Sequence, residues 1–261
     1  MEDCALQALL TQNQRERLRA AVARRTSVRA YIAPPDVAQL SALSFSAARL
    51  RVPGMRLEIG ACEDDRLYFG VPFVDKILGS GSYAAVIVER GAPYGRLYAG
   101  ACGEALALEA VSLGLGTCWV SGTFRRGAVA LPLDAHERVA AVIALGVPAR
   151  EKHKRTPRKK LTELCSTDPA GWPLWAFDAA ECVRVAPSKM NMQPWRLSYA
   201  GHTLQLEKTP LADDLDMGIA LLHLSLGVGE REHILRFGEG RVAATLFSRD
   251  DQEALPPEPT V

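Results

Sequence analysis

Residues 186–195 place polar side chains between two prolines, immediately before an expected strand. Pro187 and Pro194 fix their backbone φ angles, so the segment is expected to be extended or turned. The polar side chains displayed on this stiff backbone are Ser188, Asn191 and Gln193. Hydroxyl and amide groups both donate and accept hydrogen bonds, which suits a planar ligand such as a flavin or a nucleobase. The alternative is that these side chains bond to the backbone of their own loop, as Ser and Asn often do in turns.

A second candidate binding element lies near the N-terminus, where Arg25, Ser27 and Arg29 follow an expected helix over residues 12–23. If the backbone is extended there, alternate side chains share a face, and these three groups can then converge on one phosphate. Arginine binds phosphate through charge-assisted hydrogen bonds that each contribute roughly 1.5 to 3 kcal/mol. The alternative is a solvated helix end, whose cations complement the helix dipole.

Six cations occur in a second basic run, residues 152–160. The run is too short and too poor in aromatic residues to indicate nucleic-acid binding. Most of it is expected to be a solvated loop. One or two of its cations can bind the same phosphate that is proposed for Arg25.

The composition is that of a globular protein with a sizeable core, because 48% of the 261 residues are hydrophobic. A net charge of +1, from 31 basic and 30 acidic residues, gives no general attraction to nucleic acid or to an anionic membrane. The six cysteines form no C-x-x-C pair and have no histidine at ligand spacing, so we expect reduced thiols and no metal site. No signal-like segment or membrane-length apolar run is found, so we expect a cytoplasmic protein.

The elements that position these residues occur twice along the chain. Ser-Leu-Gly-Leu-Gly at 112–116 and Ser-Leu-Gly-Val-Gly at 225–229 are each expected to close a helix, with glycine as the left-handed cap. Strands are expected before and after these helices, at 55–59 and 139–145 in the first copy and at 195–199 and 242–247 in the second. The pattern predicts a duplicated domain packed on itself.

The two copies differ in the candidate binding segments. Aligning Met55 with Trp195 sets residues 45–54 against 185–194, and the first copy lacks counterparts of the three polar side chains. Conversely, the first copy has a long connection, 117–124, where the second has only a short charged link, 230–233. These complementary losses favour one site built jointly between the halves. The alternative is simple drift in two packed copies.

Three motifs together resemble the FMN-dependent nitroreductase family: Arg25-x-Ser27-x-Arg29, residues 114–119, and residues 186–195. The resemblance spans nearly the whole chain but is loose between the motifs. Ordinary members are homodimers in which each flavin site takes residues from both subunits, so this chain is similar to the fused-repeat branch. The resemblance implies an α+β fold of two tandem halves, 1–165 and 166–250. Each half would carry an antiparallel-rich sheet covered by helices, packed as a pseudo-dimer. Separately, the proline-rich end of the sequence predicts a flexible or surface tail over 251–261.

The resemblance also implies residue roles. It assigns the ribityl phosphate to Arg25, Ser27 and Arg29, with Arg158 as a supplementary cation. It assigns the flavin ring or ribityl chain to Pro187, Ser188, Asn191 and Gln193, and it matches Ser121 and Gly122 with the backbone that approaches flavin N5. Thr156 replaces a lysine that is common in the family, which weakens the phosphate site or shifts that role to Lys154 or Arg155.

The implied activity is ping-pong reduction of nitroaromatics or quinones, with FMN as cofactor and NAD(P)H as electron donor. The flavin would carry the chemistry, so no catalytic side chain is required; His136 and His223 are expected to be structural. One alternative is an impaired module that binds a flavin or another planar ligand without turnover. Another is a flavin dehydrogenase or dehalogenase acting on a biosynthetic intermediate. A fused dimer has less need of a partner, so we expect a monomer, with a homodimer as the alternative.

Overall fold

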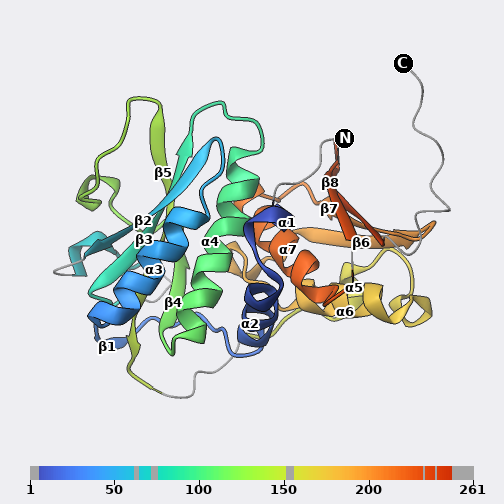
Figure 1. Ribbon diagram of the computed structural model, residues 1–261, viewed down its shortest axis with the longest axis horizontal. Helices are drawn as coiled ribbons and strands as arrows, with labels where there is room; N and C mark the ends of the chain where they lie inside the picture. The colour runs from blue at the N-terminus through green and yellow to red at the C-terminus, as the bar shows by residue number, and fades with distance from the viewer. Residues whose placement is uncertain are drawn as a thin grey trace.

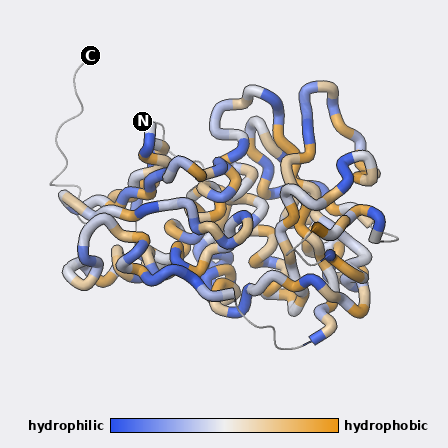
Figure 2. The backbone as a smooth tube through the Cα atoms, turned by 180° about the vertical axis from the view of Figure 1, so that it is seen from behind, coloured by the Kyte–Doolittle hydropathy of each residue, from blue (hydrophilic) through white to orange (hydrophobic). Residues whose placement is uncertain are grey.

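The computed structural model describes residues 6–61, 65–71, 76–150, 156–231, 233–238 and 240–248. Two antiparallel sheets lie at opposite ends of the molecule, with a group of helices between them (Figure 1). Stretches of hydrophobic residues occur at both ends of the molecule, and many residues of the outer loops are hydrophilic (Figure 2). Together these features confirm the α+β fold class.

The first sheet contains β1 (Tyr31–Ala33), β2 (Met55–Ala61), β3 (Ser82–Glu89), β4 (Gly116–Val120) and β5 (Glu137–Pro148). Its strand order is β1-β5-β3-β2, and β4 also pairs with the long strand β5. Seven of the eight residues of β3 are buried. Such a continuous apolar strand is expected where a sheet is covered on both faces.

The second sheet contains β6 (Trp195–Ala200), β7 (Thr203–Lys208), β8 (His233–Phe237) and β9 (Val242–Ser248), in the order β6-β7-β9-β8. This order repeats β2-β3-β5-β4 of the first sheet, and every pairing in both sheets is antiparallel. Helix α3 (Val37–Arg49) precedes β2 as α6 (Leu174–Arg184) precedes β6. The repeat of strands and helices therefore follows the repeat in the sequence; the boundary between residues 165 and 166 stays a prediction.

Two central helices, α4 (Gly95–Ser112) and α7 (Asp214–Gly227), lie against each other between the sheets. They run parallel, because contacts from Arg96 to Asp213 and from Glu104 to His223 advance along both helices in the same direction. Glycines allow the backbones to approach closely. A Cβ on Gly100 would lie 2.1 Å from the Leu215 carbonyl oxygen, and a Cβ on Gly218 would lie 1.9 Å from the Leu97 carbonyl oxygen.

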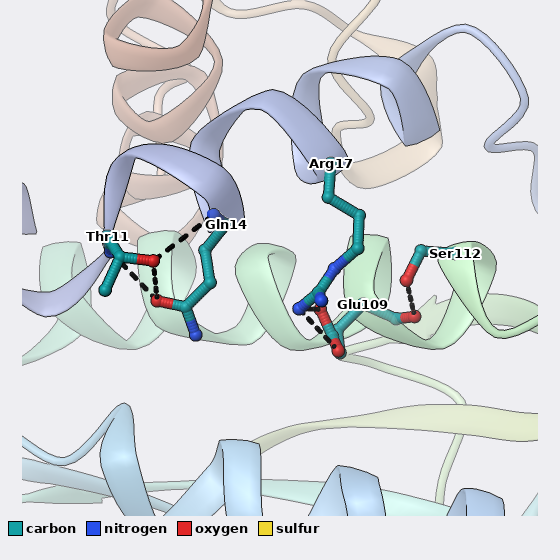
Figure 3. Close-up of polar contacts among 5 residues, drawn as sticks. All are labelled: Thr11, Gln14, Arg17, Glu109 and Ser112. Carbon is teal, nitrogen blue, oxygen red and sulfur yellow. Dashed lines mark hydrogen bonds and ion pairs between the residues drawn. The ribbon is translucent and has the colours of Figure 1, made fainter.

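The N-terminal arm packs on both central helices. It consists of α1 (Leu6–Leu9) and α2 (Gln12–Val22), and α2 begins with a capping box between Thr11 and Gln14 (Figure 3). Arg17 donates two hydrogen bonds to Glu109 of α4, at 2.7 and 2.9 Å (Figure 3), and Arg15 donates one to Ser225 of α7, at 3.2 Å.

The remaining elements are short. Helix α5 spans Leu161–Leu164. The 3-10 turns are η1 (Asp65–Leu67), η2 (Arg126–Ala128), η3 (Pro169–Gly171) and η4 (Lys189–Asn191). Within the described ranges, no helix combines the length and apolar character needed to cross a membrane.

Both glycine-rich motifs end a helix, as predicted, but they are not equivalent position by position. The left-handed glycine is Gly114, third in the first motif, with φ 84°, and Gly229, fifth in the second motif, with φ 74°. Gly227, which the sequence alignment sets against Gly114, is still the last residue of α7. The helix caps are therefore displaced by two residues between the copies.

The prediction that residues 117–124 form a connection absent from the second copy is wrong. The first half of this segment, residues 117–120, belongs to β4, which pairs with β5 as β8 pairs with β9. The first half instead has a longer loop after that strand, residues 121–136, where the second half has 238–241 between β8 and β9. The two flanking glycines suggested a loop, whereas Thr117, Trp119 and Val120 have the side chains that favour a strand.

Candidate functional site

The loop between α6 and β6 is turned, as its prolines predict. Its centre is the 3-10 turn η4, and three non-glycine residues have left-handed backbones: Met190 (φ 49°), Asn191 (φ 57°) and Gln193 (φ 48°). Each such conformation costs on the order of 1 to 3 kcal/mol and persists only when surrounding contacts impose it. Residues held this way concentrate at ligand sites, so this loop is a candidate binding site.

Hydrogen bonds within the loop impose that shape. Ser188 Oγ accepts a hydrogen bond from the Gln193 backbone N–H at 2.8 Å. Gln193 Nε2 donates to the Asn191 carbonyl oxygen at 2.9 Å. Gln193 Nε2 also donates to Asn191 Oδ1 at 3.3 Å. The three polar side chains singled out by the sequence therefore do stabilise their own loop, which was the alternative to ligand binding.

The same side chains also bind the end of the first half. Arg158 donates to Asn191 Oδ1 at 2.6 Å, and Asn191 Nδ2 donates to the Pro157 carbonyl oxygen at 2.8 Å. The Lys159 backbone N–H donates to Gln193 Oε1 at 2.8 Å. The structure thus brings Arg158 together with the loop predicted to face the ligand. Lys154 and Arg155, the alternative cations, lie outside the described residues.

Asp216, in the first turn of α7, anchors the other side of this loop. Its Oδ1 accepts a hydrogen bond from the Lys189 backbone N–H at 3.0 Å, while its buried Oδ2 has no hydrogen-bond partner among the described residues. Burial, together with the nearby carboxylate of Asp213, raises the pKa of Asp216 to about 6, despite the hydrogen bond from Lys189. Sequence reasoning missed this residue, because an aspartate in the first turn of a helix is an ordinary feature.

The segment that contains Arg25, Ser27 and Arg29 is extended, which is the condition for its alternate side chains to share a face. Ser27 pairs with Thr117 of β4 in a parallel bridge, and the Val28 backbone N–H donates to the Thr117 carbonyl oxygen at 2.9 Å. Ser27 and Arg29 are half-buried. The Arg25 side chain is only 3% exposed, so the three residues do not present one common face to solvent.

Arg25 points into a buried cluster centred on Glu104 of α4. Arg25 Nε lies 3.5 Å from Glu104 Oε1, and His223 Nε2 of α7 lies 3.1 Å from the same oxygen. Trp119 Nε1 donates to Glu104 Oε2 at 2.7 Å. Sequence reasoning missed Glu104, because nothing local distinguishes it from a surface acid on a helix.

The charges of this cluster stabilise one another. Burial alone would raise the pKa of Glu104, but the hydrogen bond with His223 and the charge of Arg25 outweigh it and hold the pKa below its usual value. Burial would lower the pKa of His223, but its contacts with Cys182 and Glu104 raise the pKa to about 9. His223 therefore lies in the core, consistent with the expected structural role; His136 is exposed, just before β5.

Ser121 and Gly122 follow the end of β4. Ser121 is half-buried and Gly122 is exposed. A Cβ added to Gly122 would have no atom within 4 Å, so the backbone there is open to an approaching ligand. This is the one predicted position at which backbone N–H groups, rather than side chains, would make the contact.

A cavity of about 330 Å³ lies elsewhere, at the start of β2. Its lining includes residues 51–54, part of the segment that the sequence alignment sets against the polar loop of the second half. Arg56, also in the lining, is already held by Glu137 at 2.7 Å. This cavity is therefore separate from the contacts around Asn191. Over the described residues, no group of three His, Cys, Asp or Glu side chains is placed to hold a metal ion.

Comparison with known proteins relates the chain to one family. The family described as "Putative TM nitroreductase" matches residues 17–228. A putative nitroreductase from Thermotoga maritima MSB8 is similar in structure, with a TM-score of 0.64 and 22% identity over 88% of this chain and 93% of that chain. That likeness shows a common fold. No curated protein sequence matches this chain.

Two shorter solved structures match part of the chain with lower scores. A putative nitroreductase from Desulfovibrio desulfuricans, in complex with FMN, has a TM-score of 0.47 and 24% identity over 60% of this chain and 98% of that one. A putative NADH dehydrogenase/NAD(P)H nitroreductase from Parabacteroides distasonis has a TM-score of 0.47 and 20% identity over 59% of this chain and 98% of that one.

Proposed function

This chain belongs to the Putative TM nitroreductase family, and from that premise we propose that it binds FMN between its two halves. We propose further that it uses NAD(P)H to reduce small acceptors such as nitroaromatics or quinones. Family membership supports the class of chemistry. The contacts among this chain's own residues support the location of the FMN site.

One observation carries the proposed site: the polar loop of the second half is hydrogen-bonded to the end of the first half. Arg158 to Asn191, at 2.6 Å, and Lys159 to Gln193, at 2.8 Å, are the bonds concerned. A fixed cation beside a strained loop of amide and hydroxyl groups suits a ligand with a phosphate and a polar planar ring. In this proposal Pro187 and Ser188 complete the wall that faces the ring.

The residues fit FMN with one change from the expectation. Ser27, Arg29 and Arg158 remain the proposed phosphate ligands. Arg25 is buried against Glu104, so we assign it to support of the segment rather than to direct contact. The open backbone at Gly122, next to Ser121, suits close approach of the ring.

When bound, FMN would supply the transfer of hydride from NAD(P)H to the acceptor. The chain's own residues would bind and orient it: cations at the phosphate, amides and a hydroxyl beside the ring, and backbone N–H groups at the end of β4. Donor and acceptor would use one exposed face in turn, which gives ping-pong kinetics.

Titration of the purified protein with FMN, followed by flavin fluorescence, tests the proposal. We expect binding at micromolar concentration or tighter, and oxidation of NADH or NADPH when menadione is added. Protein that neither carries nor binds FMN would refute the proposed function. Steady-state rates at several acceptor concentrations should give parallel reciprocal plots.

A second candidate, a module that holds flavin without turnover, is favoured by one observation. Ser188, Asn191 and Gln193 already make hydrogen bonds inside the protein, so fewer of their groups remain for a ligand. FMN binding without NAD(P)H oxidation, tested with both nucleotides and both acceptor classes, would identify this alternative.

We also propose a monomer with one site per chain, because both halves of the site come from one chain. Light scattering after size-exclusion chromatography would give the mass, and the FMN titration would give the stoichiometry. A dimer, or two FMN per chain, would contradict this part of the proposal.

A further inference from the structure

A buried polar cluster lies between the two central helices, and the proposed chemistry does not use it. The side chains of Glu104, His223 and Arg25 are 0%, 1% and 3% exposed. Burying a carboxylate costs several kcal/mol unless charged and hydrogen-bonding partners surround it, and apolar side chains would often pack such a space at no loss of stability. The presence of this cluster therefore calls for a reason other than packing.

Glu104 connects the segments of the first half that contain proposed ligand contacts. Arg25, 3.5 Å from Glu104, lies two positions before Ser27. Trp119, which donates to Glu104 at 2.7 Å, lies two positions before Ser121. A single carboxylate thus contacts both segments shortly before each reaches the proposed site.

The second half reaches the same carboxylate through His223 of α7, at 3.1 Å. His223 Nδ1 lies 2.9 Å from the carbonyl oxygen of Cys182 in α6. With one acceptor at each ring nitrogen, the imidazole is placed to donate from both, which describes its protonated form. Its raised pKa, about 9, agrees with this geometry.

We propose that Glu104 is a positioning residue that holds Arg25 and Trp119, and through them residues 25–29 and 119–122, against the second half. The identity of the ligand that these segments would bind, FMN, rests on the proposed function. The positioning of the two segments by Glu104 does not depend on it. The groups that face Glu104 are Arg25 from the segment before β1, Trp119 from β4 and His223 from α7; Cys182 from α6 faces His223.

Glu104→Gln isolates this role, because glutamine keeps the size and one acceptor oxygen. The amide oxygen can still accept from Trp119. The amide nitrogen, however, is a donor that would face the donors of Arg25 or His223. We therefore expect the two segments to loosen while the rest of the chain stays folded.

Glu109→Gln is the matched control. Glu109 lies on the same helix and is largely buried as well, but its carboxylate pairs with Arg17 of α2, at 2.7 Å (Figure 3), and not with the cluster around His223. Loss of that pair should affect α2 and leave β4 and residues 25–29 unchanged.

Hydrogen exchange followed by mass spectrometry, on protein without added ligand, tests the positioning directly. In Glu104→Gln we expect peptides that cover 25–31 and 117–122 to exchange about fivefold faster or more, as the loss of one charge-assisted hydrogen bond implies. Peptides from β6, β7 and β9 should not change. No change in the two segments, or an equal increase everywhere, would overturn the inference.

FMN titration of the same variants separates the two proposals. We expect Glu104→Gln to bind FMN about fivefold more weakly or worse, and Glu109→Gln to bind as the wild type does. If the wild type binds FMN and Glu104→Gln binds equally well, the positioning role is refuted and the proposed function stands. If the wild type fails to bind, the proposed function fails and hydrogen exchange alone decides the positioning role.

Trp119→Phe provides a second test in case Glu104→Gln does not fold. It removes one donor to Glu104 and retains an aromatic ring. Faster exchange in 117–122, with a smaller effect in 25–31, would support the inference; unchanged exchange in 117–122 would refute it.

Discussion

Replacing Gly218 by alanine should destabilise the protein, although alanine is the better helix former. In an exposed helix the substitution would gain about 1 kcal/mol. Here the added Cβ would lie 1.9 Å from the Leu97 carbonyl oxygen and 2.9 Å from the Ala101 nitrogen, where ordinary contact begins at 3.4 Å. Both obstructing atoms are backbone atoms, so the helices would have to separate by about 1.5 Å.

The magnitude follows from the packing around this contact. Overpacking a core costs roughly 1 to 3 kcal/mol, and sites where no side chain can rotate away belong at the upper end. After the gain in helix propensity is subtracted, we expect a net loss of about 2 kcal/mol. The Gly100→Ala/Gly218→Ala double variant should lose less than the sum of the two, because one separation of α4 and α7 relieves both contacts.

Urea unfolding followed by circular dichroism measures this loss. Gly171→Ala is the control, because a Cβ there meets no atom within 4 Å, and its effect should stay within about 0.5 kcal/mol. A Gly218→Ala protein as stable as the wild type would refute the close contact. Additive losses in the double variant would show that the two glycines do not share one contact.

Three further predictions concern charge. The stabilisation from His223 should be complete below about pH 6.5 and lost as the pH rises through about 9, because folding raises its pKa; urea unfolding of His223→Gln should lack this alkaline decline. Asp216→Asn should stabilise the protein by about 1 kcal/mol at pH 7, where the buried carboxylate is charged at a cost, and the gain should vanish below about pH 4; a loss at pH 7 would contradict this. Arg158→Ala should weaken FMN binding about tenfold in equilibrium dialysis, and an equal effect of Arg49→Ala, far from the proposed ligands in sequence, would count against the assignment.

Local signals in the sequence predicted much of the fold. Pro187 and Pro194 predicted an extended or turned loop, and Gly114 predicted a helix end, because proline restricts backbone angles and glycine permits unusual ones regardless of tertiary context. The expected strands were confirmed: 139–145 and 242–247 are apolar runs, whereas 55–59 and 195–199 alternate apolar and polar side chains, and both patterns are typical of strands. Strand β4 was missed, since its flanking glycines outweighed a short stretch of strand-forming side chains.

The surroundings of Glu104, Glu109 and Arg25 could not be predicted from the sequence, because they depend on tertiary contacts. Glu104 and Glu109 lie on one helix among alanines and leucines, yet Glu104 is fully buried beside His223, whereas Glu109, 12% exposed, pairs with the half-exposed Arg17 of α2. No pattern within α4 separates them, because the difference depends on which helices pack on each face. The burial of Arg25 follows from that of Glu104, so its position could not be predicted locally either.

The parallel packing of α4 and α7 has an electrostatic consequence. The macrodipoles of parallel neighbours add rather than cancel, so two partial positive charges meet where both helices begin. Helix α4 has no acidic residue in its first turn, and Arg96 adds a further positive charge there. Helix α7 begins with Asp213, Asp214 and Asp216, and Asp213 accepts a hydrogen bond from Arg96. The carboxylates of one helix therefore neutralise the starting ends of both.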